Sequence, residues 1–207
     1  MMRTDKSTVP KIFQDHSSTL KGTSCNNAAA KSDSATPEDK YMTQSLFPVI
    51  DFDAVKNAYV KKFHCSPVPA SNDALIHHED EYFFIEFKDG NMKNEIHGVQ
   101  RKILESLLLF GDITNTTISF SRKHVNYMLV YNEEKSKAYM QKNLPADEVQ
   151  DSSAIGDFIR ALGREAKRNV DYFGLRKQFK DIYFKEVYSC EKREFPYWSK
   201  KLWEAEV

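Results

Sequence analysis

Hydrophobic residues recur along this chain with two different periods, and each period predicts its own kind of element. From Met92 to Phe110 the apolar residues fall three or four positions apart, which is typical of an amphipathic helix, and Gly111 predicts its end. Similar spacing predicts helices over about 51–63, 153–169 and 195–203. Short apolar runs predict strands near 74–78, 82–88, 125–131 and 182–188.

The order of these elements indicates the fold class and the domain organisation. Strands that alternate with helical patterns indicate an α/β (α+β) fold, and residues 45–207 are expected to form one such domain. Residues 1–44 are rich in Ser, Thr, Asn, Lys and Asp, and their apolar residues are isolated. This composition predicts a disordered or loosely attached tail, with a partner-binding arm as the alternative.

The segment from Asp73 to Gly90 predicts two strands joined by an acidic turn at Glu79-Asp80. If those two residues alone form the loop, Asp73 lies opposite Glu86 with Cβ atoms about 5 Å apart. A four-residue loop would keep this register, whereas a three-residue loop would place Asp73 opposite Phe87, on the other face of the hairpin. The turn contains no Asn-Gly or similar pair, so the sequence leaves this register open.

The second strand of this hairpin carries a carboxylate and a lysine on one face. Alternate side chains of a strand point to opposite faces, so Glu86 and Lys88 lie together, away from an apolar face of Phe83, Ile85 and Phe87. Two adjacent carboxylates repel unless a proton, a lysine or a cation lies between them. Such oxygen-rich sites suit Mg²⁺ or Mn²⁺, which use few protein ligands and retain several waters.

This group of residues predicts hydrolysis of phosphodiester bonds in nucleic acid. A metal held by Asp73 and Glu86 would activate water and stabilise charge on a phosphate. The backbone carbonyl of Phe87 would add a ligand, since it lies between the two side chains. Lys88 would orient the attacking water or neutralise the charge that develops on the phosphate.

An acid, a hairpin, Glu86-Phe87-Lys88, an amphipathic helix and a strand, over roughly residues 50–132, resemble the core of the PD-(D/E)xK nuclease-like superfamily (restriction-endonuclease-like fold). The resemblance implies a central mixed sheet flanked by helices, with Asp73 and Glu86 as metal ligands and Lys88 as the catalytic lysine. Some branches carry a glutamine on the following helix, and Gln100 is the matching residue.

The sequence also departs from that pattern and supports a second interpretation. Asn72 stands where the family has proline, and Leu104 stands where some branches have tyrosine. Glu-x-Lys is common on solvated strand faces, where Glu86 and Lys88 would form a surface ion pair of small energetic value. The alternative is therefore a non-catalytic interaction or binding protein on a nuclease-like fold.

A basic stripe on the helix predicted at 153–169 is the candidate contact for nucleic acid. Arg160, Arg164 and Lys167 follow at i, i+4 and i+7, with Arg168 beside them. Such a stripe can contact phosphates of DNA or RNA, and an ordinary solvated helix face is the alternative.

Composition limits which other classes of protein and functional site the sequence can represent. Lys+Arg and Asp+Glu both number 30, so net charge gives no argument for nucleic-acid binding and any basic surface is local. The cysteines are three and scattered, which favours a reducing cytoplasm over a disulfide framework or a CxxC metal site. No apolar run approaches the roughly 20 residues that span a bilayer, and GxxxxGK[ST], GxGxxG and HExxH are absent from the sequence.

Overall fold

A computed structural model describes residues 9–25, 36, 40–64, 66–142 and 171–204. Its centre is a six-stranded mixed sheet with strands in the order of the chain. The strands are β1 (Ser17–Thr19), β2 (Pro48–Asp51), β3 (Ala74–His78), β4 (Glu81–Lys88), β5 (Val125–Tyr131) and β6 (Glu186–Glu191). Neighbours from β1 to β4 are antiparallel, and β4, β5 and β6 are parallel. The predicted mixed α/β fold is confirmed.

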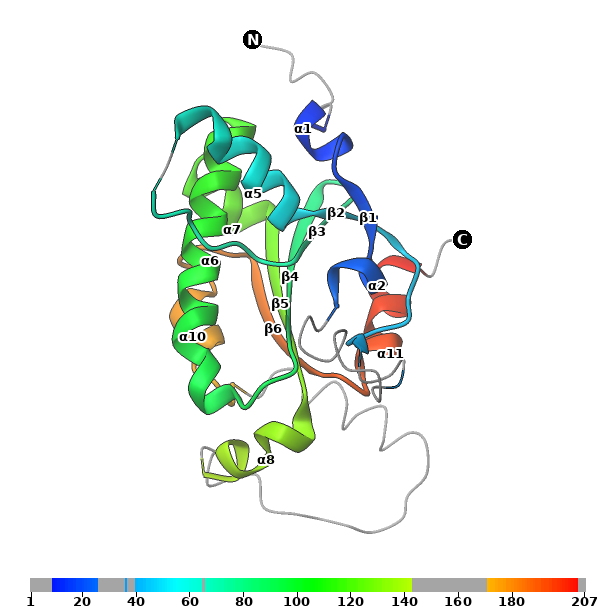
Figure 1. Ribbon diagram of the computed structural model, residues 1–207. Helices are drawn as coiled ribbons and strands as arrows, with labels where there is room; N and C mark the ends of the chain where they lie inside the picture. The colour runs from blue at the N-terminus through cyan, green and yellow to red at the C-terminus, as the bar shows by residue number, and fades with distance from the viewer. Residues whose placement is uncertain (1–8, 26–35, 37–39, 65, 143–170, 205–207) are drawn as a thin grey trace.

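Helices cover both faces of this sheet (Figure 1). One face carries α5 (Phe52–Val60), α6 (Met92–Thr114), α7 (Ile118–His124) and α10 (Leu175–Phe179). The other face carries α2 (Leu20–Thr23) and α11 (Phe195–Ser199), which continues as a π-helical turn over Lys200–Glu204. The remaining elements are α1 (Lys11–Gln14), the 3-10 turn Lys61–Phe63 after α5, and α8 (Glu133–Lys142) beyond the end of β5.

Strand β4 is buried on both sides because of this layering. Phe84 packs with the helix α6 residues Val99 and Phe110, whereas Phe83 and Ile85 belong to the core on the α11 side. A strand buried on both faces reads as a nearly continuous apolar run, as residues 82–87 do except at Glu86. Glu86 is thus the residue in this run of β4 that does not add an apolar side chain to either core.

Helix α6 begins as predicted but ends later. The side chain of Asn91 accepts a hydrogen bond from the Lys93 N–H and caps the first turn. The helix continues through Gly111 to Thr114, and Asn115 ends it in the left-handed conformation at φ 53°. A glycine inside a helix costs only about 1 kcal/mol relative to alanine, and burial of the neighbouring Phe110 offsets that cost.

The N-terminal segment is part of the folded domain where the structure describes it. Strand β1 pairs with β2, with Ser17 opposite Ile50, and Phe13 and Leu20 are fully buried. The prediction that residues 1–44 form a separate tail is therefore wrong for residues 9–25. Isolated apolar residues can fill a core when distant strands supply the surroundings, which local composition does not reveal. Residues 1–8 and 26–35 lie outside the described residues.

Phe13→Ala should lower the free energy of unfolding by about 3–5 kcal/mol, as expected for truncating a fully buried aromatic ring. The ring of Phe13 lies 6.2 Å from the rings of both Phe52 and Phe110. Urea unfolding followed by circular dichroism measures the effect. Phe63→Ala is the control, because that side chain is 58% exposed. Equal stability of the two variants would mean that the N-terminal segment does not dock on the core.

Several smaller expectations also differ from the structure. The strand predicted at 182–188 is instead β6 over Glu186–Glu191, and the helix predicted over about 51–63 is α5 followed by the 3-10 turn Lys61–Phe63. Strands β1 and β2 and helices α7 and α10 were not predicted, since each is short and lacks a clear period. The helix predicted at 153–169, with Arg160, Arg164, Lys167 and Arg168, lies outside the described residues.

Candidate active site

The hairpin between β3 and β4 has the register that a two-residue loop dictates. His78 lies opposite Glu81, and Glu79 adopts φ 53° in the loop. The regular pairing ends with Ala74 opposite Ile85, and the N–H of Asp73 donates to the carbonyl of the same Ile85 (3.1 Å), which holds Asp73 against β4. Asp73 therefore lies beside Glu86, as the shorter loop predicts.

The backbone of β4 fixes the orientation of the first carboxylate. Asp73 Oδ2 accepts a hydrogen bond from the N–H of Phe87 at 2.7 Å. This bond ties the Asp73 side chain to the residue between Glu86 and Lys88. The two carboxylates and Lys88 consequently converge at one end of β4, on the side that α6 covers.

Glu86 is fully buried, and this overturns the picture of a solvated ion pair. Its side chain is 0% exposed, and that of Lys88 is 17% exposed. The Lys88 Nζ lies 3.1 Å from Glu86 Oε1 and 3.4 Å from Glu95 Oε2, a carboxylate on α6. Burying a charge is expensive unless it is paired, so the position of Glu86 needs an explanation beyond surface polarity.

Lys102 of α6 completes the group, although it is not among the residues predicted from the sequence. Its Nζ lies 3.0 Å from Asp73 Oδ1 and 2.8 Å from Glu86 Oε1, so it bridges carboxylates at the hairpin's start and in β4. A signal was present in the helix, because Glu95, Lys102 and Ser106 are spaced by seven and four and border the apolar stripe. Polar residues along that border face the sheet rather than solvent.

Gln100 lies on the side of α6 that faces α10. Its Nε2 donates to Oε1 of Gln178, a residue of α10, at 2.9 Å. Two positions along a helix correspond to about 200° of rotation, so Gln100 and Lys102 lie on opposite borders of the apolar stripe. The structure thus places Gln100 against α10, and Lys102 is the residue of α6 that contacts the two carboxylates, so the role of Gln100 stays a prediction.

Burial raises the pKa values of both carboxyl groups. Burial, followed by the charge of Asp73, raises the pKa of Glu86 to about 8, against the opposing effect of Lys102 and Lys88. Burial likewise raises the pKa of Asp73. Burial alone would lower the pKa of Lys102, but the charges of Glu86 and Asp73 outweigh it and the pKa is raised. The site thus favours a bound cation or a proton between its two acids.

The two oxygens of the Glu86 carboxylate have different surroundings. Oε1 lies 2.8 Å from the Lys102 Nζ and 3.1 Å from the Lys88 Nζ, whereas Oε2 is buried and has no partner among the described residues. Buried polar atoms in folded proteins nearly always have a partner, supplied by the protein, water or a ligand. A bound ligand or water would supply the partner that Oε2 of Glu86 lacks among the described residues.

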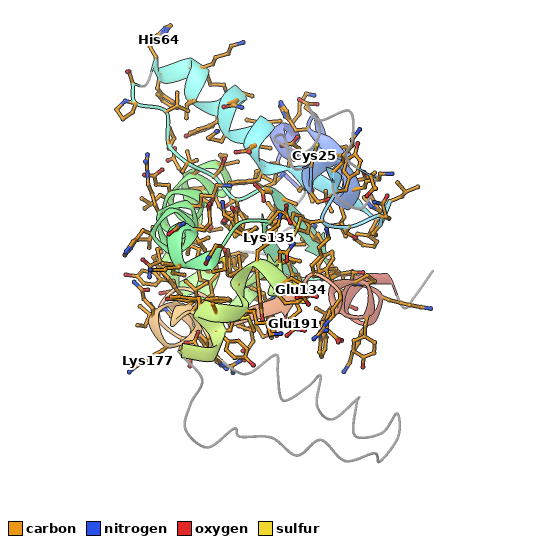
Figure 2. The ribbon with its side chains drawn as sticks, turned by 60° about the horizontal axis from the view of Figure 1, so that its bottom comes forward. Cys25, His64, Glu134, Lys135, Lys177 and Glu191 are labelled. Atoms are coloured by element: carbon orange, nitrogen blue, oxygen red, sulfur yellow. The ribbon has the colours of Figure 1, made fainter. Side chains whose placement is uncertain are left out.

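A cleft of about 470 Å³ opens beside these residues. Asp73, Lys88 and Lys102 line it from the sheet and α6, and Cys25 and Lys135 line it from the segment after α2 and from α8. Figure 2 turns this end of the molecule forward and labels Cys25 and Lys135. The cleft gives solvent and small ligands access to Asp73, whereas Glu86 is buried beside it and does not line the cleft.

The donor set limits which metals fit. Within the described ranges, no three His, Cys, Asp or Glu side chains are placed to share an ion. The candidates are two carboxylates and the Phe87 carbonyl, a set that fits Mg²⁺ or Mn²⁺ because these ions keep several waters. It does not fit a structural zinc site, which needs four protein ligands.

Comparison with known proteins gives no assignment. No family model matches the sequence, no curated protein matches it, and no solved structure matches it. The resemblance to PD-(D/E)xK nucleases stays a prediction. Among the described residues, no helix is both long and apolar enough to cross a bilayer.

Proposed function

We propose that this protein is a Mg²⁺- or Mn²⁺-dependent nuclease of the PD-(D/E)xK type. The observation that carries the proposal is the convergence of Asp73, Glu86 and Lys88 at the end of β4: Asp73 and Lys88 line a cleft, and Glu86 is fully buried beside them with an Oε2 that has no partner among the described residues. When bound, the metal would activate water and stabilise charge on the phosphate. Asp73, Glu86 and the Phe87 carbonyl would hold it.

The side chains around the metal ligands have separate tasks. The N–H of Phe87 holds Asp73 in a fixed orientation, which reduces the conformational entropy lost on binding. Glu95 and Glu86 hold the Lys88 ammonium at the border of the cleft, where it can orient water or neutralise a phosphate oxygen. Glu95 is a positioning residue in this scheme, because it acts through Lys88.

We further propose nucleic acid, either DNA or RNA, as the partner and the cytoplasm as the location. The stripe of Arg160, Arg164, Lys167 and Arg168 remains the predicted contact for the phosphate backbone. Cys25 and Cys190 are free thiols, which agrees with a reducing compartment.

A second candidate function is a non-catalytic interaction protein on the same fold. The observation that favours it is Lys102, whose ammonium already bridges Asp73 and Glu86. A closed set of charges needs no metal, and the cleft would then serve only to bind a partner. Metal binding separates the two candidates.

The test combines cleavage with metal-induced stabilisation. Purified protein is incubated with single- and double-stranded DNA and RNA in Mg²⁺, Mn²⁺ or EDTA, and its melting temperature is measured with each ion. A nuclease should cleave at least one substrate only when metal is present. Metal at about a hundred times its Kd should raise the melting temperature by roughly 5 °C or more. No cleavage and no stabilisation would favour the interaction protein.

Asp73→Asn should abolish the metal-induced rise in melting temperature and lower cleavage by at least about a hundredfold, because it removes one of two carboxylate ligands. The amide keeps an oxygen that can accept from the Phe87 N–H, so the hairpin should stay folded. Asp15→Asn is the control, since Asp15 forms an exposed pair with Lys11 outside the cleft. Metal-dependent cleavage that survives Asp73→Asn would refute the proposed ligand set.

A further inference from the structure

Lys102 stands where a divalent cation would otherwise be expected. Its Nζ lies 3.0 Å from Asp73 Oδ1 and 2.8 Å from Glu86 Oε1, and these belong to the two side chains proposed to hold the metal. Oε1 of Glu86 also lies 3.1 Å from the Lys88 Nζ, so this one oxygen already faces two ammonium groups. The side chain of Lys102 is 22% exposed, so it reaches the carboxylates from the border of the cleft.

We propose that Lys102 is an exchangeable cation: it neutralises Asp73 and Glu86 in the metal-free protein, and a divalent metal displaces its ammonium into the cleft, where it binds a phosphate of the substrate. This inference rests on the metal site of the proposed function. It assigns a role to Lys102 that is separate from the role of Lys88.

Metal and ammonium cannot share the same oxygens. Mg²⁺ binds oxygen at about 2.0–2.1 Å and requires nearly octahedral geometry. An ammonium within 3.0 Å of both carboxylates would lie within a few ångströms of that ion. Two positive charges at such a distance repel strongly in a protein, and the carboxylate lone pairs that point between the acids are already used.

The displaced Lys102 ammonium can move into the cleft and bind an anion there. Lysine has a flexible four-carbon chain, and Lys102 lines the cleft beside Asp73 and Lys88. Two acids of α6, Glu95 and Glu105, are already paired, with Lys88 and Arg101 respectively. Asp73 stays oriented after the exchange, because the Phe87 N–H still holds Oδ2. A phosphate oxygen in the cleft is therefore a natural new partner for Lys102.

The exchange couples the two ligands. Metal binding frees a lysine for the anion, and the anion stabilises the form in which that lysine has left the carboxylates. By linkage, each ligand should increase the affinity for the other by the same factor. A lysine fixed in a permanent ion pair would give no such coupling.

Lys102→Gln should bind Mn²⁺ at least about tenfold more tightly than the wild-type protein, because the competing charge is gone. Isothermal titration measures this affinity in the full chain. Lys135→Gln is the matched control: Lys135 lines the same cleft but bonds Asp89 instead of the two ligands, so its removal should change the affinity by no more than about twofold. An Mn²⁺ affinity of Lys102→Gln equal to that of Lys135→Gln would overturn the exchange.

The second readout is the coupling itself, with thymidine 5′-monophosphate as a phosphate probe that contains no diester bond. In the wild-type protein, Mg²⁺ should increase the affinity for this probe by at least about fivefold more than it does in Lys102→Gln. Equal enhancement by Mg²⁺ in the two proteins would overturn the inference. The direct attraction between metal and phosphate is the same in both proteins, so it cancels when the two enhancements are compared.

A measurement on the wild-type chain alone covers the case in which Lys102→Gln does not fold. Mg²⁺ should raise the rate at which Lys102 is acetylated by an N-hydroxysuccinimide ester several-fold, because the ammonium leaves its ion pairs. Peptide mass spectrometry reports Lys102 and, as the internal control, Lys135. No rise at Lys102 would overturn the inference. If Lys102→Gln binds Mn²⁺ more tightly but no protein cleaves nucleic acid, the exchange is supported and the nuclease is refuted. If the wild-type protein cleaves but Lys102 shows neither the change in Mn²⁺ affinity nor the change in acetylation, the nuclease is supported and the exchange is refuted.

Discussion

Lys88→Ala should lower metal-dependent cleavage by at least about a thousandfold, within the range observed when a group that stabilises the transition state is removed. Lys88 is the last residue of β4, and its ammonium is held by Glu86 and Glu95 at the border of the cleft. Alanine leaves both carboxylate ligands in place, so metal should still raise the melting temperature. Cleavage rates and melting curves on the same preparation separate loss of chemistry from loss of binding.

The stability of this variant should fall only slightly. Glu86 keeps the Lys102 Nζ at 2.8 Å, and its raised pKa allows it to take up a proton when Lys88 is absent. Lys180→Ala is the matched control, because Lys180 is a partly buried lysine paired with Glu186 at the opposite end of the parallel strands. The mechanism is wrong if Lys88→Ala cleaves as fast as wild type. If Lys180→Ala loses as much activity as Lys88→Ala, the loss is a general effect of removing a buried lysine and does not support a catalytic role for Lys88.

The sequence predicted the part of the site that local geometry determines. Period-2 alternation places Glu86 and Lys88 on one face, and the length of the loop at Glu79-Asp80 places Asp73 beside Glu86. Both features depend on residues close together in the chain. The observed pairing of His78 with Glu81 confirms the shorter loop.

The burial of the site depended on contacts between distant residues and was not predicted. Whether Glu86 faces solvent or α6 depends on how that helix docks on β4. The rotation of α6 about its own axis likewise decides whether Gln100 or Lys102 reaches the carboxylates, and packing by Val99 and Phe110 fixes that rotation. A helical pattern predicts which residues form the apolar stripe, but it does not predict which border of the stripe lies next to the carboxylates.

The same distinction explains the N-terminal segment. Phe13 and Leu20 stand alone among polar residues, so neither helical nor strand periodicity marks them. They are buried because β1 pairs with β2, a contact across about thirty residues of chain. Composition identifies a segment that cannot fold by itself, and a sheet edge formed elsewhere can still bind it.

Glu86→Gln should abolish cleavage and also weaken the destabilising effect of alkaline pH. Glutamine has nearly the same shape but no charge to bury, and it cannot balance a divalent metal. In the wild-type protein, burial and Asp73 raise the pKa of Glu86 from 4.5 to about 8. The folded state therefore holds a proton that the unfolded state has released across this range.

The sign of the pH effect follows from that difference in bound protons. The unfolded state binds fewer protons than the folded state between about pH 4.5 and pH 8, so the free energy of unfolding falls as pH rises through this window. The loss should amount to a few kcal/mol, on the order of 1.4 kcal/mol for each pH unit that separates the folded-state pKa from the unfolded-state pKa. The raised pKa of Asp73 acts in the same direction.

Denaturant unfolding of both proteins between about pH 5 and pH 9 tests this expectation. Wild-type stability should decline over that interval, whereas Glu86→Gln should decline less and be the more stable protein at the alkaline end. Glu186→Gln, which removes a half-buried acid paired with Lys180, should decline as the wild type does. Parallel curves for wild type and Glu86→Gln would show that Glu86 is ionised in the folded protein throughout. In that case the ammonium groups of Lys102 and Lys88 outweigh the effect of burial on Glu86 in the metal-free protein.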